Sequence, residues 1–179
     1  MTRTHATLEA RRVVYDGRIF RVEVDKVRLP TDHRVVMEIV RHPGSVVLLP
    51  MPSAHEIILI RQYRYTIDRW IWELPAGTLK PTEDPLAGAI RECEEEIGQV
   101  PGRVDRVGSF YPTPGFCDEE MIFFRCSDLR APDPNSAVHK DEDEELEPRT
   151  FALDEARTLV VSGQIVDMKT VVGLTLLHL

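Results

Sequence analysis

The sequence predicts an α+β fold, in which helices pack around a mixed or antiparallel sheet. Segments 46–49 and 57–60 are short, continuous apolar runs separated by a loop with proline and polar residues, a pattern typical of buried strands. Segment 85–97 places apolar residues at helical spacing, and segments 153–162 and 167–178 also have helical patterns. Further strands are expected at 70–74, 103–110, 121–125 and 147–153. Together these elements indicate a sandwich.

The composition is that of an ordinary globular protein, with 42% hydrophobic and 29% charged residues. No apolar run approaches the roughly 20 residues that span a bilayer, and the N-terminus lacks the apolar stretch of a secretory signal. The three cysteines form no CxxC pair, which disfavours a disulfide framework and a structural zinc site. A formal net charge of −8 argues against nucleic acid as a partner. We therefore expect a cytoplasmic protein with neither a nucleic-acid nor a membrane partner.

The first 44 residues are expected to form a β extension ahead of the main domain. Residues 1–10 are expected to be a frayed arm, and segment 12–40 contains valine-rich runs with turn signals at 16–17 and 30–33. Two or three such strands are marginal by themselves. We therefore divide the chain into an extension at 1–44 and a main domain at 45–179, and expect the extension to pack on that domain or on a second subunit.

The helix at 85–97 has clear start and stop signals. Asp84 can cap its N-terminus, Pro85 suits the first helical position, and Gly98 is a common helix terminator. An apolar stripe is expected to face the core, and it consists of Leu86, Ile90, Cys93 and Ile97.

Three carboxylates share a different face of this helix. At about 100° per residue, Glu92, Glu95 and Glu96 lie side by side. Like charges at this spacing destabilise a helix unless something neutralises them. Clustered carboxylates suit Mg²⁺ or Mn²⁺, which also bridge readily to substrate phosphates. The alternative for these glutamates alone is a solvated acidic face without function.

Segment 77–99, GTLKPTEDPLAGAIRECEEEIGQ, resembles the Nudix box. The matching positions are Gly77, Glu83, Arg91, Glu92, Glu95, Glu96 and Gly98. Cys93 fills an apolar position acceptably, whereas Gln99 departs from the family pattern. The resemblance implies a Nudix α/β/α sandwich whose three helix carboxylates bind the metal, with the backbone carbonyl of Ala76 as a further ligand. It also implies structural roles for the two glycines and for a Glu83–Arg91 ion pair.

Flanking motifs are similar to those of the ADP-ribose pyrophosphatase subfamily. Segment 72–77, WELPAG, resembles its ELPAG run, and segment 113–119, TPGFCDE, resembles a loop whose proline lies about sixteen residues beyond the box. Segments 15–20 and 41–44 match its N-terminal strands, which exchange between two subunits. The resemblance thus implies a domain-swapped homodimer, a substrate site to which the extension contributes, and hydrolysis of ADP-ribose to AMP and ribose 5-phosphate.

The same resemblance implies further site residues, each with a simpler alternative. Arg64 would bind the diphosphate or be a surface ion-pair partner, and Glu73 of the ELPAG-like run is assigned to the substrate site. Glu119 would contact ribose or a metal, or cap its loop. Phe20, or Tyr15, would stack on adenine from the other subunit or serve as core.

The general base is expected in the acidic loop 141–145. Glu142 and Glu144 both fit this role, and we do not choose between them; Glu95 is the next candidate. A solvated acidic loop is the alternative.

Three other functions compete with ADP-ribose hydrolysis. The first is hydrolysis of another nucleotide sugar such as ADP-glucose or GDP-mannose. The second is a non-catalytic Nudix module that senses a nucleotide, and the third is a purely structural domain. The presence of all three helix carboxylates favours an enzyme over a sensor.

Overall fold

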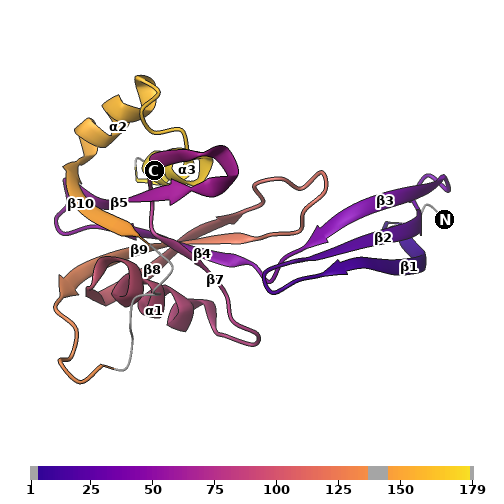
Figure 1. Cartoon of the computed structure of the whole chain (residues 1–179), viewed down its shortest axis with the longest axis horizontal. Helices are drawn as coiled ribbons and strands as arrows, with labels where there is room; N and C mark the ends of the chain where they lie inside the picture. Colours follow the sequence, from indigo (N-terminus) through magenta and orange to yellow (C-terminus); the bar gives the residue numbers. More distant parts are fainter. Residues whose placement is uncertain (1–3, 137–144, 178–179) are drawn as a thin grey trace. The chain divides into compact units, whose positions relative to one another are not determined.

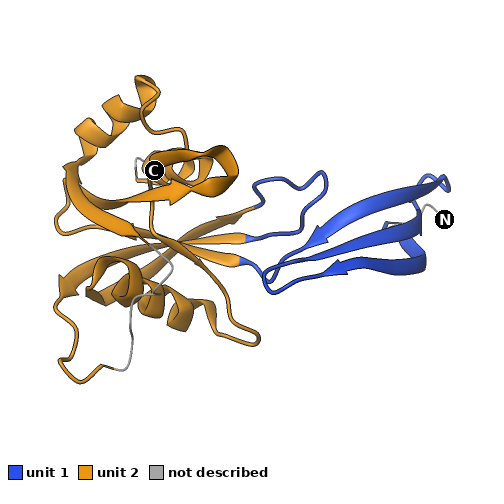
Figure 2. Cartoon of the chain, viewed as in Figure 1, with its two compact units in different colours: residues 1–44, 111–120 blue, residues 45–110, 121–179 orange. Residues whose placement is uncertain are grey.

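The computed structural model describes residues 4–136 and 145–177 and contains two compact units. Unit 1 comprises residues 1–44 and 111–120, and unit 2 comprises residues 45–110 and 121–179 (Figure 2). Glu142 and Glu144 lie outside the described residues. Each unit is described separately below.

Unit 1 is built on a three-stranded antiparallel sheet (Figure 1). Its strands, in the order β1-β2-β3, are β1 (Thr7–Asp16), β2 (Arg21–Arg28) and β3 (Arg34–Arg41). The prediction of a frayed arm over residues 1–10 is wrong from Thr7 onward, because Thr7 pairs with Arg28 and Leu8 with Val27. All ten residues of β1 are exposed, so the strand has no apolar alternation by which the sequence could reveal it.

The buried face of the β2 strand is ionic. Glu23 and Asp25 are both buried there, and Arg11 and Arg41 each pair with both carboxylates. Buried ion pairs contribute little net stability compared with apolar packing. The buried positions of β2 are thus occupied by charged residues and not by apolar ones. This agrees with the marginal stability expected of the extension.

Segment 111–120 continues the sheet of unit 1. The N–H of Val40 donates to the carbonyl of Phe116 at 2.7 Å, and the N–H of Asp118 donates to the carbonyl of Val40 at 3.1 Å. The Asp118 carboxylate also accepts a hydrogen bond from the backbone N–H of His42 at 2.9 Å. The TPGFCDE motif is thus tied to the end of β3, about seventy residues earlier in the chain.

Unit 2 contains two sheets. The four-stranded sheet has the order β7-β4-β9-β8 and comprises β4 (Ser45–Pro50), β7 (Ala76–Thr78), β8 (Val100–Phe110) and β9 (Met121–Arg130). The three-stranded sheet has the order β10-β5-β6 and comprises β5 (Glu56–Arg64), β6 (Arg69–Glu73) and β10 (Leu146–Ala152). The pairing of β4 with β9 is parallel, and the other pairings are antiparallel.

Helices cover both sides of these sheets. The helices are α1 (Pro85–Ile97), α2 (Leu153–Val161) and α3 (Met168–Leu176), with a short 3₁₀ turn, η1 (Tyr65–Ile67), after β5. Val46 and Leu48 of β4 pack in the cluster that includes α1, whereas Val47 and Leu49 pack in the cluster that includes α2 and α3. Because successive strand residues point to opposite faces, the apolar runs are buried on both sides. The predicted α+β sandwich is confirmed.

The buried face of α1 differs from the predicted stripe. Cys93 and Ile97 are buried, but Leu86 is 44% exposed and Ile90 is only partly buried. Gly88, Ala89, Glu92 and Glu96 are buried instead. The buried face of α1 is therefore shifted toward its glutamates, because the small Gly88 and Ala89 allow close packing and Glu96 accepts a hydrogen bond from the backbone N–H of Ala76.

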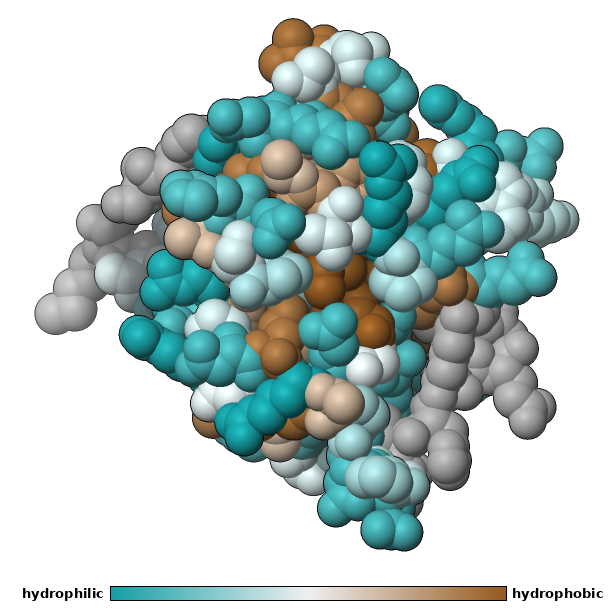
Figure 3. Space-filling view, turned by 90° about the vertical axis from the view of Figure 1, so that its left-hand side faces the viewer, coloured by the Kyte–Doolittle hydropathy of each residue, from teal (hydrophilic) through white to brown (hydrophobic). Residues whose placement is uncertain are grey.

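One face of the molecule is shown in space-filling form in Figure 3. The face drawn in Figure 3 is largely hydrophilic, with a smaller group of hydrophobic residues near its centre. Within the described residues, no helix is long and apolar enough to cross a membrane.

Candidate active site

The position of α1 is defined at both ends by local sequence. The Asp84 carboxylate accepts a hydrogen bond from the N–H of Ala87 at 3.1 Å, and Pro85 begins the helix. Gly98 adopts a left-handed conformation with φ of 66°, and its N–H donates to the helix carbonyls. These predicted caps are present, and they fix where α1 begins and ends.

Two carboxylates of α1 contact the backbone of β7. Glu96 Oε2 accepts a hydrogen bond from the N–H of Ala76 at 2.9 Å. A Cβ atom added to Gly77 would lie 1.8 Å from Glu92 Oε1, so any other residue here would require this carboxylate to move. Glu92 and Glu96 are 7% and 6% exposed, respectively. The box glycine thus permits close packing between the carboxylates and the segment carrying Ala76.

Arg91 donates hydrogen bonds to three glutamates of the box. It donates from Nε and Nη2 to the two oxygens of Glu83, at 2.8 and 3.0 Å, so the ion pair implied by the resemblance is present. These hydrogen bonds hold the pKa of Glu83 below its usual value and raise that of Arg91. Arg91 Nη1 also donates to Glu92 Oε1 at 2.6 Å and to Glu95 Oε2 at 2.5 Å.

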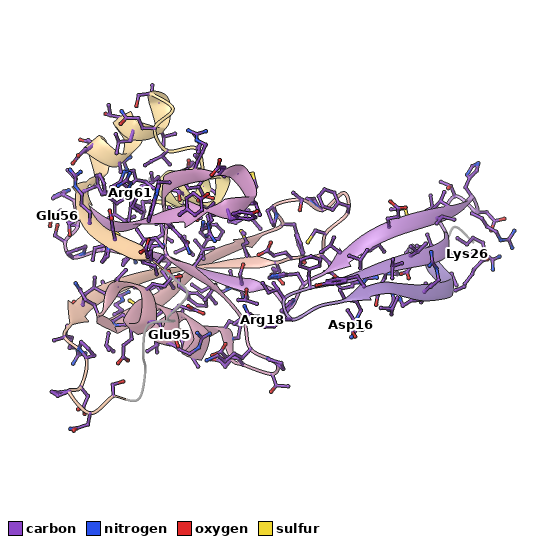
Figure 4. All side chains as sticks on the ribbon, in the orientation of Figure 1. Asp16, Arg18, Lys26, Glu56, Arg61 and Glu95 are labelled. Atoms are coloured by element: carbon purple, nitrogen blue, oxygen red, sulfur yellow. The ribbon has the colours of Figure 1, made fainter. Side chains whose placement is uncertain are left out.

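The carboxylate oxygens of α1 are chemically suited to bind a divalent cation. Glu92 and Glu95 already converge on one cationic nitrogen, and carboxylate oxygens are the ligands that Mg²⁺ and Mn²⁺ prefer. Figure 4 shows Glu95 on α1. Within the described residues, however, no three acidic, histidine or cysteine side chains form a ready metal-binding cluster. The residues of α1 that would hold such an ion are Glu92, Glu95 and Glu96.

Arg64 and Glu73, both assigned to the substrate site, contact one another. Arg64 donates from Nε and Nη2 to the two oxygens of Glu73, at 2.6 and 2.7 Å. Burial would raise the pKa of Glu73, but its contacts with Arg64 and Lys169 outweigh this and lower it. Glu73 is 1% exposed, whereas the Arg64 side chain is 39% exposed and can reach a ligand.

Sequence reasoning missed Lys169, which also pairs with Glu73. The available signal was a single lysine in the apolar segment 165–177, preceded by the helix-capping Asp167. Its partner lies 96 residues earlier in the chain, so no local pattern could identify the contact.

The other two assigned residues, Phe20 and Glu119, lie in unit 1. Phe20 is 41% exposed and lies 5.6 Å from Tyr15, measured between ring centroids. An open hollow of about 320 Å³ is lined by Phe20 together with Asp16, Gly17, Ile19, Arg21, Arg41, His42 and Pro43. Glu119 Oε1 lies 3.8 Å from His42 Nδ1, which borders this hollow.

Comparison with protein families identifies the chain. The NUDIX domain model matches residues 40–167, which include the entire box and its packing partners in β4, β5 and β7. The chain belongs to the Nudix family. The predicted resemblance is therefore confirmed.

The relatives of this Nudix protein are named for different functions. It is 36% identical to the "Methanol dehydrogenase activator" of Bacillus methanolicus, over 93% of this chain and 89% of the relative. It is 34% identical to the "ADP-ribose pyrophosphatase" of Bacillus subtilis, over 95% of this chain and 91% of that protein. The "GDP-mannose pyrophosphatase" of Citrobacter koseri is 31% identical, over 77% of this chain and 74% of the relative.

A solved structure supports the fold. The crystal structure of an "ADP compounds hydrolase" matches this Nudix chain with a TM-score of 0.82 and covers 98% of this chain and 93% of the other. The sequence identity is 22%, so this similarity is evidence for the architecture alone.

Proposed function

We propose that this chain is a pyrophosphohydrolase that cleaves the pyrophosphate bond of a nucleoside diphosphate sugar, with ADP-ribose giving AMP and ribose 5-phosphate. The complete carboxylate set of the box is the observation that carries this proposal: Glu92 and Glu96 lie against β7, and Glu95 shares the guanidinium of Arg91 with Glu92. Relatives named ADP-ribose pyrophosphatase, at 34% and 32% identity, support the substrate. The GDP-mannose relatives support the alternative of another nucleotide sugar.

The proposed metal ligands are Glu92, Glu95, Glu96 and the carbonyl of Ala76, and the proposed ion is Mg²⁺ or Mn²⁺. Such an ion supplies a Lewis acid that neutralises charge on the phosphates and acidifies water. The chain itself prepares this site by keeping Glu92 and Glu96 against β7, where Glu96 is already held by the N–H of Ala76.

The remaining residues are proposed to bind substrate and move a proton. Arg64 donates from its guanidinium to a non-bridging diphosphate oxygen. A carboxylate of the acidic loop, Glu142 or Glu144, accepts the proton of the attacking water, with Glu95 as the next candidate. The water oxygen bonds to one phosphorus as the bridging P–O bond breaks, and the released phosphate group carries away the bridging oxygen. Phe20 stacks on the base and Glu119 contacts ribose.

A substrate panel tests the reaction. ADP-ribose, ADP-glucose and GDP-mannose are incubated with the protein and either Mg²⁺ or Mn²⁺, and products are identified by mass. We expect ADP-ribose to have the highest kcat/KM and to yield AMP and ribose 5-phosphate, with no turnover in EDTA. Saturable nucleotide binding without cleavage of any compound would instead support a sensing module.

We also propose a homodimer formed through unit 1. Its exposed apolar side chains far outnumber its buried ones, and they include Leu8, Val13, Val14, Tyr15, Val36 and Met37. Deleting residues 1–41 is expected to produce aggregate or an inactive monomer, because the strands that would cover each other are lost. Light scattering of the intact and shortened chains measures this. A shortened chain that is a stable, active monomer would contradict the proposal.

We propose a cytoplasmic location. The support is the cysteine pattern, since Cys93, Cys117 and Cys126 are all free in the structure, as is usual in a reducing compartment.

A further inference from the structure

A buried lysine lies in α3 beside the proposed substrate site. Lys169 is 7% exposed, and its Nζ pairs with Glu73 Oε2 and lies 3.2 Å from Asp167 Oδ2. Lysine is rarely buried to this extent, and an apolar residue of similar volume would often stabilise such a position as well or better. A lysine at this position, paired with the buried Glu73, therefore points to a role in the charge balance of the site.

Glu73 leaves one edge of Arg64 available. The hydrogen bonds of Arg64 to described residues use Nε and Nη2, so Nη1 remains for another acceptor. A two-point contact of this kind fixes the plane of the guanidinium. Glu96 is among the carboxylates whose charge raises the pKa of Arg64, which places Arg64 within electrostatic range of the Nudix box.

The charge of Lys169 affects how strongly the Arg64 guanidinium can attract an anion. If Glu73 paired with Arg64 alone, one negative charge would cancel one positive charge. Lys169 shares the same carboxylate and also pairs with Asp167, so the four groups together carry no net charge, whereas without Lys169 they would carry one net negative charge. Asp167, the nearby acid, is also engaged in capping α3, where its Oδ2 accepts from the N–H of Thr170 at 2.9 Å. Lys169 therefore offsets the excess negative charge that Glu73 and Asp167 would otherwise place beside Arg64, whose exposed edge can then attract an anion.

The backbone holds Lys169 in this place. Thr170 Oγ1 accepts a hydrogen bond from the N–H of Leu74 at 2.7 Å and donates to Asp167 Oδ2 at 2.5 Å. A Cβ on Gly173 would lie 2.3 Å from Leu74 Cδ1, so helix and strand are in close contact. The start of α3 is thus attached to residues 73–74, directly before the segment that carries Ala76.

We propose that Lys169 is a positioning residue for diphosphate binding: by sharing Glu73 it keeps the outer edge of Arg64 positive and oriented toward the phosphates. This inference rests on the proposed function only in its choice of ligand class. It assigns Lys169 to ground-state binding, and the chemical step does not depend on it.

The test uses the full chain and inorganic pyrophosphate, a probe that lacks base and sugar. Calorimetry in metal-free buffer at low salt is expected to show binding by the wild type, about tenfold weaker binding by Lys169→Met, and near wild-type binding by Lys169→Arg. High salt should reduce the difference. If Lys169→Met does not fold, Lys169→Gln serves instead, because it keeps a donor toward Glu73 without the charge.

Kinetics with ADP-ribose provide the second measurement. Lys169→Met is expected to raise KM about tenfold with kcat changed less than about twofold, which is the pattern of lost ground-state binding. Equal pyrophosphate affinity in wild type and Lys169→Met, no pyrophosphate binding by the wild type, or failure of Lys169→Arg to restore binding would each overturn the inference. A wild type that binds pyrophosphate and cleaves no nucleotide sugar would refute the proposed function while leaving Lys169's role in anion binding supported by the variants.

Discussion

Glu96→Gln is expected to lower kcat about 100- to 1,000-fold while the melting temperature stays close to that of the wild type. Loss of a charged ligand removes several kcal/mol of stabilisation of the phosphate charge that develops during the reaction. The fold should survive because a Gln side-chain oxygen can still accept the hydrogen bond from the N–H of Ala76. Steady-state kinetics across a metal titration, together with a thermal melt, measure both effects.

Glu92→Gln should behave in the same way, since Gln has the same shape beside Gly77. Glu94→Gln is the matched control on the same helix, because Glu94 forms no ion pair with the described residues and should leave kcat unchanged. Near wild-type turnover of Glu96→Gln or Glu92→Gln at saturating metal would remove that residue from the proposed ligand set.

Arg91→Ala is expected to lower the free energy of unfolding by about 2 to 3 kcal/mol and to reduce activity as well. Its guanidinium bonds Glu83, Glu92 and Glu95, and the Arg91 side chain is only 16% exposed. Removing it leaves three partly buried carboxylates without their shared cation. In a chain of this size the loss corresponds to a decrease of about 5 to 10 °C in melting temperature.

Glu145→Gln is the control for this variant, because Glu145 is exposed and should affect neither stability nor rate. Added Mg²⁺ or Mn²⁺ should restore part of the stability of Arg91→Ala, since the ion can take the vacated position between Glu92 and Glu95. If Arg91→Ala melted like the wild type yet had no activity, Arg91 would act directly in the reaction, and its structural assignment would be wrong.

The Nudix box was readable from sequence because its chemistry is encoded within one helix and the loop before it. Helical periodicity places Glu92, Glu95 and Glu96 on one face whatever the rest of the chain does. The caps at Asp84 and Gly98 follow from local backbone preferences in the same way. The buried strands of β4 and β5 were also evident, because strands packed on both faces have continuous apolar sequences.

The first half of strand β1, residues 7–11, and the orientation of α1 were not evident from sequence, whereas β structure from residue 12 onward was predicted. A fully exposed strand is defined by backbone pairing with β2 and so has no hydrophobic period. The exposure of Leu86 and the burial of Glu92 and Glu96 depend on where α1 lies against β7, which periodicity does not specify.

The sequence by itself thus determined the family, the metal-binding helix and the class of reaction expected. Only the tertiary structure decided which charged groups pair. Arg91 bonds Glu92 and Glu95, and Lys169 pairs with Glu73 across 96 residues of chain. The physical reason is the distance along the chain over which each interaction acts. Helix periodicity and capping act over a few residues, whereas an ion pair between distant segments requires that the sheets first bring those segments together.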